Sequence, residues 1–257
     1  MSLLATDEPA AFTEVRRQGR SNIIIVVDHA SARTPRSLGV LGLPPSELHR
    51  HIAWDIGALH VAARVAQRLD ATLVAQNYSR LVIDCNRHPD VPSSIPPLSE
   101  NSEIPGNRGL SEAAVAARRT EIFWPYHHHI GALIDERLAA GRPCILVAQH
   151  TMTDVFKDVH RPMHAAVLYN RDRRFAGWVL DALRQERELL VADNEPYFVS
   201  DATDYTIPVH AEARGLPHVE IEIRQDLVGD EAGQAAWAER ITRALLAAEQ
   251  IMGAEQP

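Results

Sequence analysis

The sequence has little cysteine and no long apolar run. Its 257 residues include two cysteines, Cys85 and Cys144, both within apolar stretches, so we expect core residues and no disulfide framework. No apolar run approaches the roughly 20 residues that a bilayer-spanning helix needs. The first residues, MSLLATDEPAAF, carry neither a basic leader nor a sustained apolar segment. We therefore expect a soluble, cytoplasmic protein that does not bind membranes.

Basic residues are also in deficit. Lysine and arginine number 26 against 34 acidic residues, which gives a formal net charge of −8. Nucleic-acid binding needs a positive surface, so this balance argues against nucleic acid as a partner. At 46% hydrophobic and 23% charged residues, the composition shows no sign of disorder. The length suits one large domain, and we expect a single domain over residues 1–257.

Several local catalytic motifs are missing. The sequence contains no GxSxG elbow, which leaves a serine hydrolase without support, and neither GxGxxG nor a phosphate-binding loop for nucleotides. It also lacks HExxH and CxxC, so any metal site must be assembled from residues far apart in the chain.

Two apolar runs that predict buried strands are each followed closely by a histidine. Residues 23–27, IIIVV, are β-branched and continuous, as in a strand covered on both faces, and Asp28-His29 follows them. Residues 144–148, CILVA, repeat this pattern and lead to His150. Open α/β sheets place their chemistry at the carboxyl ends of strands. The two imidazoles are therefore predicted to meet at one edge of a sheet and to form a metal site.

The remaining periodicity alternates strands with helices. This alternation predicts an α/β fold with a mixed, largely parallel sheet flanked by helices. The first 20 residues read as a short helix or arm. The further strands are expected at 71–76, 79–85, 164–169, 189–192 and 218–224, and the helices at 47–69, 111–140 with a break near Pro125, 175–187 and 229–251.

Residues 89–109 interrupt this rhythm. Five prolines and little apolar content exclude a regular element. The segment is predicted to be a surface loop or an active-site lid, and a loop without a function is an equal alternative.

Candidate site residues extend beyond the two histidines. Asp55 could be a third metal ligand, although an acid within a helix is usually solvated. Two histidines and a carboxylate suit zinc or another divalent metal. Glu222, on the polar face of the alternating strand 218–224, could act as the general base of an amide or ester hydrolysis. Four arginines could bind a small anionic substrate or simply pair with Asp84, Glu220 and Glu222: Arg80, Arg87, Arg161 and Arg224.

Six stretches taken in order resemble the N-formylglutamate amidohydrolase family: VDHASARTP (27–35), WDIGA (54–58), SRLVIDCNR (79–87), YHHHI (126–130), QHTMT (149–153) and EIEIRQDL (220–227). The resemblance implies a phosphorylase/hydrolase-like fold related to zinc carboxypeptidases and aspartoacylases. It also implies metal-dependent removal of the formyl group from N-formyl-L-glutamate.

The resemblance also assigns residues. It implies His29, Asp55 and His150 as metal ligands and Glu222 as the base. The Tyr126-His127 pair selects His127 as a second catalytic residue among three successive histidines, which cannot all face one way on a helix. Asn86 joins the substrate-binding arginines as part of SRLVIDCNR.

Two departures from the family pattern stand out. Ala32 occupies the position of the glutamate in the His-x-x-Glu pair of the carboxypeptidase relatives. The first turn reads Asp-His-Ala-Ser where typical members have Pro-His-Ser-Gly.

The leading hypothesis is a zinc-type hydrolase of N-formyl-L-glutamate. A hydrolase of another N-acyl amino acid or of a cell-wall amide is an alternative within the same chemistry. A non-catalytic protein that binds small anions, with the arginines but no metal, is the alternative from a different class.

Overall fold

A seven-stranded sheet forms the centre of the molecule. The computed structural model describes residues 2–255, and in this part of the chain the strand order is β1-β3-β2-β6-β11-β9-β10. β3, β2, β6 and β11 are parallel, whereas β1 and β9 are antiparallel to their neighbours β3 and β11. The strands are β1 Phe12–Val15, β2 Ile23–Val27, β3 Thr72–Gln76, β6 Ile145–Met152, β9 Ala165–Leu168, β10 Val191–Asp193 and β11 His218–Arg224. The predicted α/β class with a largely parallel sheet is confirmed.

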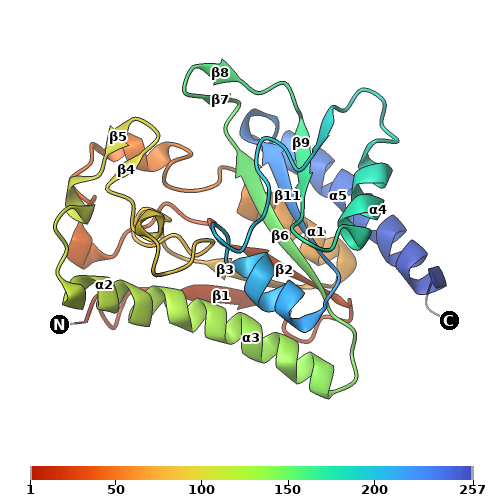
Figure 1. Cartoon of the computed structure of the whole chain (residues 1–257), viewed down its shortest axis with the longest axis horizontal. Helices are drawn as coiled ribbons and strands as arrows, with labels where there is room; N and C mark the ends of the chain where they lie inside the picture. The colour runs from red at the N-terminus through yellow and green to blue at the C-terminus, as the bar shows by residue number, and fades with distance from the viewer. Residues whose placement is uncertain (1, 256–257) are drawn as a thin grey trace.

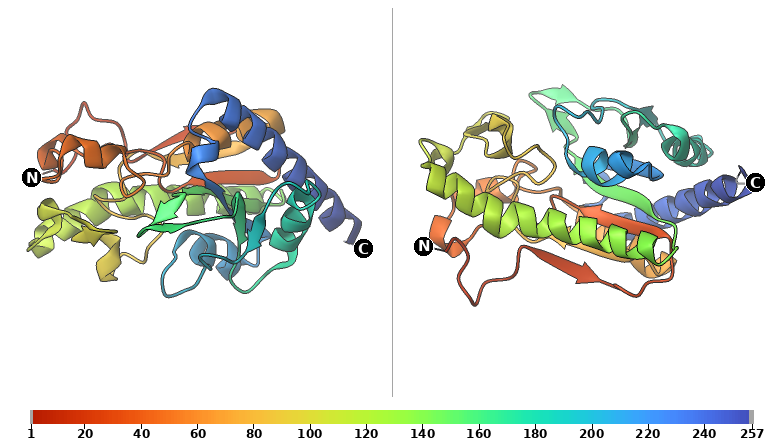
Figure 2. Two further views of the ribbon diagram at one scale, coloured as in Figure 1. Left: turned by 90° about the horizontal axis from the view of Figure 1, so that it is seen from above. Right: turned by 60° about the horizontal axis from the view of Figure 1, so that its bottom comes forward.

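Helices cover both faces of this sheet (Figures 1 and 2). One face packs against α1 (Ala58–Leu69), α4 (Arg174–Leu183) and α5 (Glu231–Glu255). The other packs against α3 (Trp124–Ala139), which continues α2 (Glu112–Arg118). β2 shows why its sequence is apolar throughout: Ile23, Ile25 and Val27 belong to the first core, and Ile24 and Val26 to the second. A strand buried on both faces needs apolar side chains at every position.

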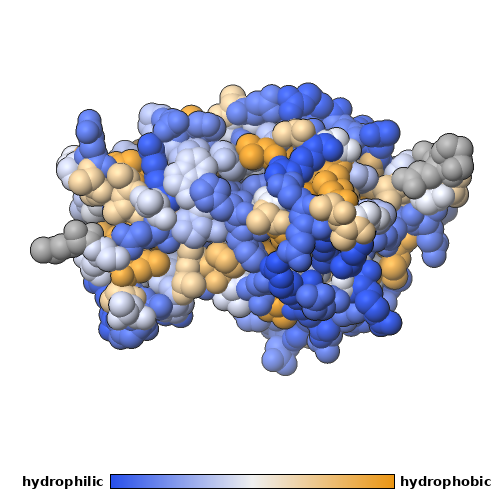
Figure 3. All heavy atoms as spheres, turned by 90° about the horizontal axis from the view of Figure 1, so that it is seen from below, coloured by the Kyte–Doolittle hydropathy of each residue, from blue (hydrophilic) through white to orange (hydrophobic). Residues whose placement is uncertain are grey.

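The lower face of the molecule, in the orientation of Figure 1, is polar. Seen from below, the surface is largely hydrophilic and its apolar side chains lie in small separate patches (Figure 3). Within residues 2–255, no helix combines the length and the apolarity needed to cross a membrane.

Short elements complete the chain. The hairpins β4–β5 (Leu98–Ser99, Ser102–Glu103) and β7–β8 (Val155–Phe156, Val159–His160) lie towards the top of Figure 1. Single 3-10 turns occur at Arg36–Leu38, Pro45–His49, Pro92–Ser94, Pro105–Asn107, Glu212–Arg214 and Gln225–Leu227, and π-helical turns at Arg119–Phe123 and Ile207–Ala211.

The prediction of one helix over 47–69 is wrong in its first half. The chain forms a 3-10 turn at Pro45–His49, and α1 begins only at Ala58. In between, the backbone N–H of Asp55 donates to the carbonyl of His29 at 2.9 Å. This contact withdraws Asp55 from helical bonding, and Gly57 then turns the chain with a φ of 83°.

The predicted strand over 79–85 is also absent from the described structure. These residues form turns, with Ser79 Oγ donating to the carbonyl of Ala53 and the backbone N–H of Asp84 donating to the carbonyl of Ser94. The buried guanidinium of Arg118 donates to the carbonyl of Val82. Nearly all side chains of 79–85 are buried although the segment is not extended, and periodicity alone cannot distinguish such a buried turn segment from a strand.

One further prediction needs correction. Residues 12–15 form β1, which pairs with β3, where a helix or arm was predicted.

The predicted break of the helical region 111–140 near Pro125 is confirmed. The π-helical turn Arg119–Phe123 separates α2 from α3, which begins at Trp124, and Pro125 lies in the first turn of α3.

We expect Gly57→Ala to unfold the protein at lower temperature than Gly141→Ala. A Cβ at Gly57 would lie 2.6 Å from the carbonyl oxygen of Val228, whereas at Gly141 it would meet nothing within 4 Å. Both glycines have positive φ, so the left-handed conformation costs each variant about 1 kcal/mol. The clash at Gly57 adds about 2 kcal/mol. Thermal melts of the two variants measure the difference, and equal losses of stability would contradict the close approach.

Candidate active site

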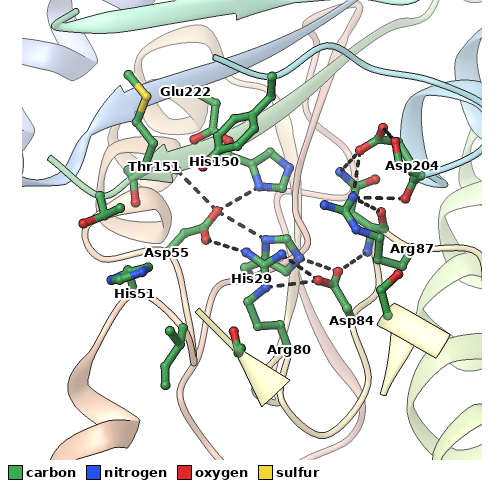
Figure 4. A pocket seen from close by; sticks show the side chains of 18 of the residues that line it. His29, His51, Asp55, Arg80, Asp84, Arg87, His150, Thr151, Asp204 and Glu222 are labelled. Carbon is green, nitrogen blue, oxygen red and sulfur yellow. Dashed lines mark hydrogen bonds and ion pairs between the residues drawn. The ribbon is translucent and has the colours of Figure 1, made fainter. Parts of the chain in front are cut away.

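Three side chains converge at the carboxyl edge of the central strands. His29, Asp55 and His150 each place one potential ligand atom so that all three atoms lie within 4.8 Å of one another. The Oδ2 atom of Asp55 is 3.3 Å from Nδ1 of His29 and 2.8 Å from Nδ1 of His150. All three residues are buried. The structure thus brings together the three residues that the sequence predicted as metal ligands (Figure 4).

The sheet explains this convergence. β2 and β6 are adjacent and parallel, so the turn after β2 carries His29 to the same edge as His150 near the end of β6. Asp55 arrives from the non-helical segment before α1. There its Oδ2 also lies 3.3 Å from the backbone N–H of Thr151, which donates to it.

Carboxylates face the other nitrogen of each imidazole. Nε2 of His29 lies 2.7 Å from Oδ1 of Asp84, and Nε2 of His150 lies 3.3 Å from Oδ2 of Asp28. Such outer carboxylates orient a histidine and make its inner nitrogen a better ligand. Arg80 balances the charge, with Nη2 at 2.6 Å from Asp84 and Nη1 at 3.5 Å from Asp55.

The charges in this cluster shift the acidities of its members. Burial alone would raise the pKa of Asp28, but hydrogen bonding and the charges of His150 and His29 lower it to about 2. Burial also opposes ionisation of Asp84, whose pKa the Arg80 and His29 charges hold well below its usual range. The surrounding carboxylates raise the pKa of His150 against the effect of burial. The cluster therefore attracts positive charge.

Two glutamates of β11 line the same cavity. In β11, Glu220 and Glu222 point to one face, and Glu222 pairs in register with His150. Burial raises the pKa of Glu220 to about 8 and that of Glu222 to about 7. Asn86 Nδ2 lies 3.4 Å from Glu220, whereas Oε2 of Glu222 is buried and has no hydrogen-bond partner among residues 2–255. Of these two glutamates, Glu222 is thus the one with a buried oxygen that no described residue engages.

Asn86 and Arg87 also line the cavity, but each is held by the loop before the π-helical turn Ile207–Ala211. Oδ1 of Asn86 accepts hydrogen bonds from the backbone N–H groups of Tyr205 and Thr206. Arg87 donates through Nη1 to Asp204 at 2.9 Å (Figure 4).

Three of the predicted site residues do not line the cavity. Arg224 pairs with Asp226 and donates to the carbonyl of Arg161, so its guanidinium is used within the fold. Arg161 lies behind the cavity wall, where it donates to the carbonyl of Thr153 and to the hydroxyl of Tyr197.

His127 is the third. Its Nε2 is 2.8 Å from the carbonyl oxygen of Cys85, and its Nδ1 is 3.0 Å from Nε2 of His210. Burial lowers the pKa of His127 to about 4. Both nitrogens are engaged within the core, so the structure does not bring His127 to the other site residues.

Sequence reasoning missed the outer carboxylates. Asp28 precedes His29 directly, and Asp84 lies within SRLVIDCNR, so both had a signal in their position beside predicted site residues. Asp204 had none, because only the folded chain brings it to Arg87.

The cavity has a volume of about 630 Å³. The predicted loop 89–109 supplies part of its wall, through Ser93, Pro96, Leu98, Ser99 and Glu100. This segment is therefore part of the site. The prediction that it holds no regular element is wrong, because the β4–β5 hairpin and two 3-10 turns lie within it.

Comparisons with known proteins show the family and the fold of this chain. The family model for N-formylglutamate amidohydrolase matches residues 21–229. The crystal structure of gene product Atu2144 from Agrobacterium tumefaciens is 37% identical, with a TM-score of 0.94 over 98% of this chain and 99% of that one. The N-formylglutamate amidohydrolase from Ralstonia eutropha JMP134 has the same fold, with 20% identity and a TM-score of 0.69 over 96% of this chain and 100% of that one. No curated protein matches. The chain belongs to the N-formylglutamate amidohydrolase family.

Proposed function

We propose that the protein is a metal-dependent hydrolase of the amide bond in small N-acyl amino acids. Family membership supports an amidohydrolase. The observation that carries the finer proposal is the convergence of His29, Asp55 and His150 at the wall of a cavity, next to the uncommitted carboxylate of Glu222.

The residues present fit a divalent metal. Two imidazole nitrogens and one carboxylate oxygen form a donor set that zinc accepts while leaving a position open for substrate. The outer carboxylates Asp84 and Asp28 would keep both histidines in the ligating orientation. A metal bound by these residues would supply a Lewis acid that polarises the amide carbonyl.

The chain itself would handle the proton. Glu222 has a raised pKa and an unpaired oxygen, so it can take a proton from the attacking water and pass it to the leaving nitrogen. Arg80, between Asp55 and Asp84, would offset part of the negative charge that develops on the substrate in the tetrahedral intermediate.

Small anionic substrates suit this cavity. Arg87 lines it and would bind the carboxylate of the amino acid. The family description makes N-formyl-L-glutamate the first compound of the class to test. Another N-acyl amino acid or a cell-wall amide would use the same chemistry, whereas a non-catalytic anion-binding protein would need neither the metal nor Glu222.

Purified protein should contain stoichiometric zinc or another divalent metal. We expect His29→Ala and His150→Ala each to lose it, because each removes one of three ligands. His128→Ala is the control, since His128 is exposed on α3. Elemental analysis by mass spectrometry measures the content, and full metal occupancy in both ligand variants would refute the site.

Glu222→Gln should lose at least about a hundredfold in kcat for release of formate from N-formyl-L-glutamate, because the amide cannot accept a proton. Its metal content should stay at the wild-type level. Glu220→Gln provides the comparison, with a smaller loss because Glu220 is already contacted by Asn86. The reverse order of losses would assign the base to Glu220.

A further inference from the structure

The mouth of the cavity is apolar and aromatic, in contrast to its charged floor. Three segments supply these apolar lining residues: Leu98 from the loop 89–109, Phe156 from the β7–β8 hairpin, and Tyr197 with Phe198 from the loop after β10. Leu98 is 56% exposed and Phe198 67% exposed, although both border a cavity. Large apolar side chains left open at the entrance of a site are available to a ligand.

Buried Arg161 holds two of these rings in place. Its guanidinium carbon is 5.1 Å from the ring centroid of Phe156 and 4.8 Å from that of Tyr197. It also donates to the Tyr197 hydroxyl and to the carbonyl of Thr153. The aromatic mouth is therefore pre-organised by a cation inserted between two loops, which reduces the entropy lost when a ligand packs against it.

The floor offers few free cations. Nε and Nη2 of Arg80 both bind Asp84, and Nη1 lies 3.5 Å from Asp55. Arg87 uses only Nη1 within the described chain, for Asp204 and two backbone carbonyls, so its Nε and Nη2 remain available. One arginine edge can bind one carboxylate. The donors of Arg80 are already used, so a second carboxylate in the cavity would find no free arginine edge among the described residues that line it.

The loop after β10 connects the two regions. Its residues Thr203 and Asp204 accept hydrogen bonds from Arg87, and the same loop carries Tyr197 and Phe198. A ligand whose carboxylate binds Arg87 thus lies in a cavity that opens directly onto the aromatic mouth.

From these observations we infer an apolar subsite, formed by Leu98, Phe156, Tyr197 and Phe198, that selects N-acyl amino acids with one carboxylate and a bulky apolar side chain over the dianionic N-formyl-L-glutamate. This inference rests on the proposed function and narrows its substrate class. Phe198 has the largest exposed fraction of the four, and we assign it as the specificity-determining residue.

Three substrates with the same scissile bond test the subsite: N-formyl-L-phenylalanine, N-formyl-L-glutamate and N-formyl-L-alanine. For the metal-loaded enzyme we expect kcat/KM to be about tenfold higher for the phenylalanine compound than for the other two, because filling an apolar pocket discriminates by this order. Phe198→Ala should lower kcat/KM about tenfold for that compound through KM, and much less for the alanine compound, whose methyl group cannot fill the subsite. Leu190→Ala, another exposed apolar residue that does not line the cavity, is the control.

Equal kcat/KM for the three substrates, or equal losses in Phe198→Ala and Leu190→Ala, would overturn the subsite and leave the hydrolase proposal standing. Calorimetric binding of the same compounds to Glu222→Gln separates the two proposals, since binding needs no turnover. If nothing is hydrolysed, the proposed function fails. Even then, the subsite is supported if Glu222→Gln binds N-formyl-L-phenylalanine more tightly than the other two compounds and the double variant Glu222→Gln/Phe198→Ala loses this preference. Equal dissociation constants for the three compounds would reject the subsite.

Discussion

The contact of one buried carboxylate oxygen with two imidazoles organises this protein. Oδ2 of Asp55 touches Nδ1 of both His29 and His150 and accepts from the backbone of Thr151. A buried charge is costly unless partners compensate it, and here the partners come from the ends of two adjacent strands. The segment before α1 must leave helical geometry to deliver Asp55, which is why the helix starts at Ala58.

Hydrogen bonds tie the cluster to the core on the α3 side of the sheet. Oδ1 of Asp28 accepts from the hydroxyls of Tyr126 on α3 and Thr206 near the π-helical turn, while its Oδ2 faces His150. Asp84 bridges His29 and Arg80 in the same way. Side chains locked by such outer contacts hold a site in a single geometry, as ligation of a metal requires. The packing of α3 on the sheet is therefore also part of the site.

The arginines divide into two kinds once their partners are known. Arg80 belongs to the cluster, and Arg87 retains donors for a ligand. Arg161 and Arg224 hold loops together by cation–π contacts and by bonds to backbone carbonyls. Guanidinium groups serve both purposes because their five donors suit carboxylates and carbonyls equally. Residue type alone cannot separate them.

The sequence by itself determined the parallel centre of the sheet and the convergence of His29 and His150 at one edge of it. The apolar runs 23–27 and 144–148 must be buried on both faces, and parallel strands end at one edge, so His29 and His150 were bound to lie close. The strand 218–224 likewise fixed Glu220 and Glu222 on one face by its period of two.

Only the tertiary structure decided the surroundings of these residues. The stretch 79–85 alternates like a strand but folds as turns, because Arg118 and the loop 89–109 satisfy its backbone from outside. His127 turned inward to Cys85 and His210, although the family pattern pointed to it. Asp204 pairs with Arg87, although more than a hundred residues separate them in the sequence. Partners of this kind depend on long-range packing, which local periodicity does not encode.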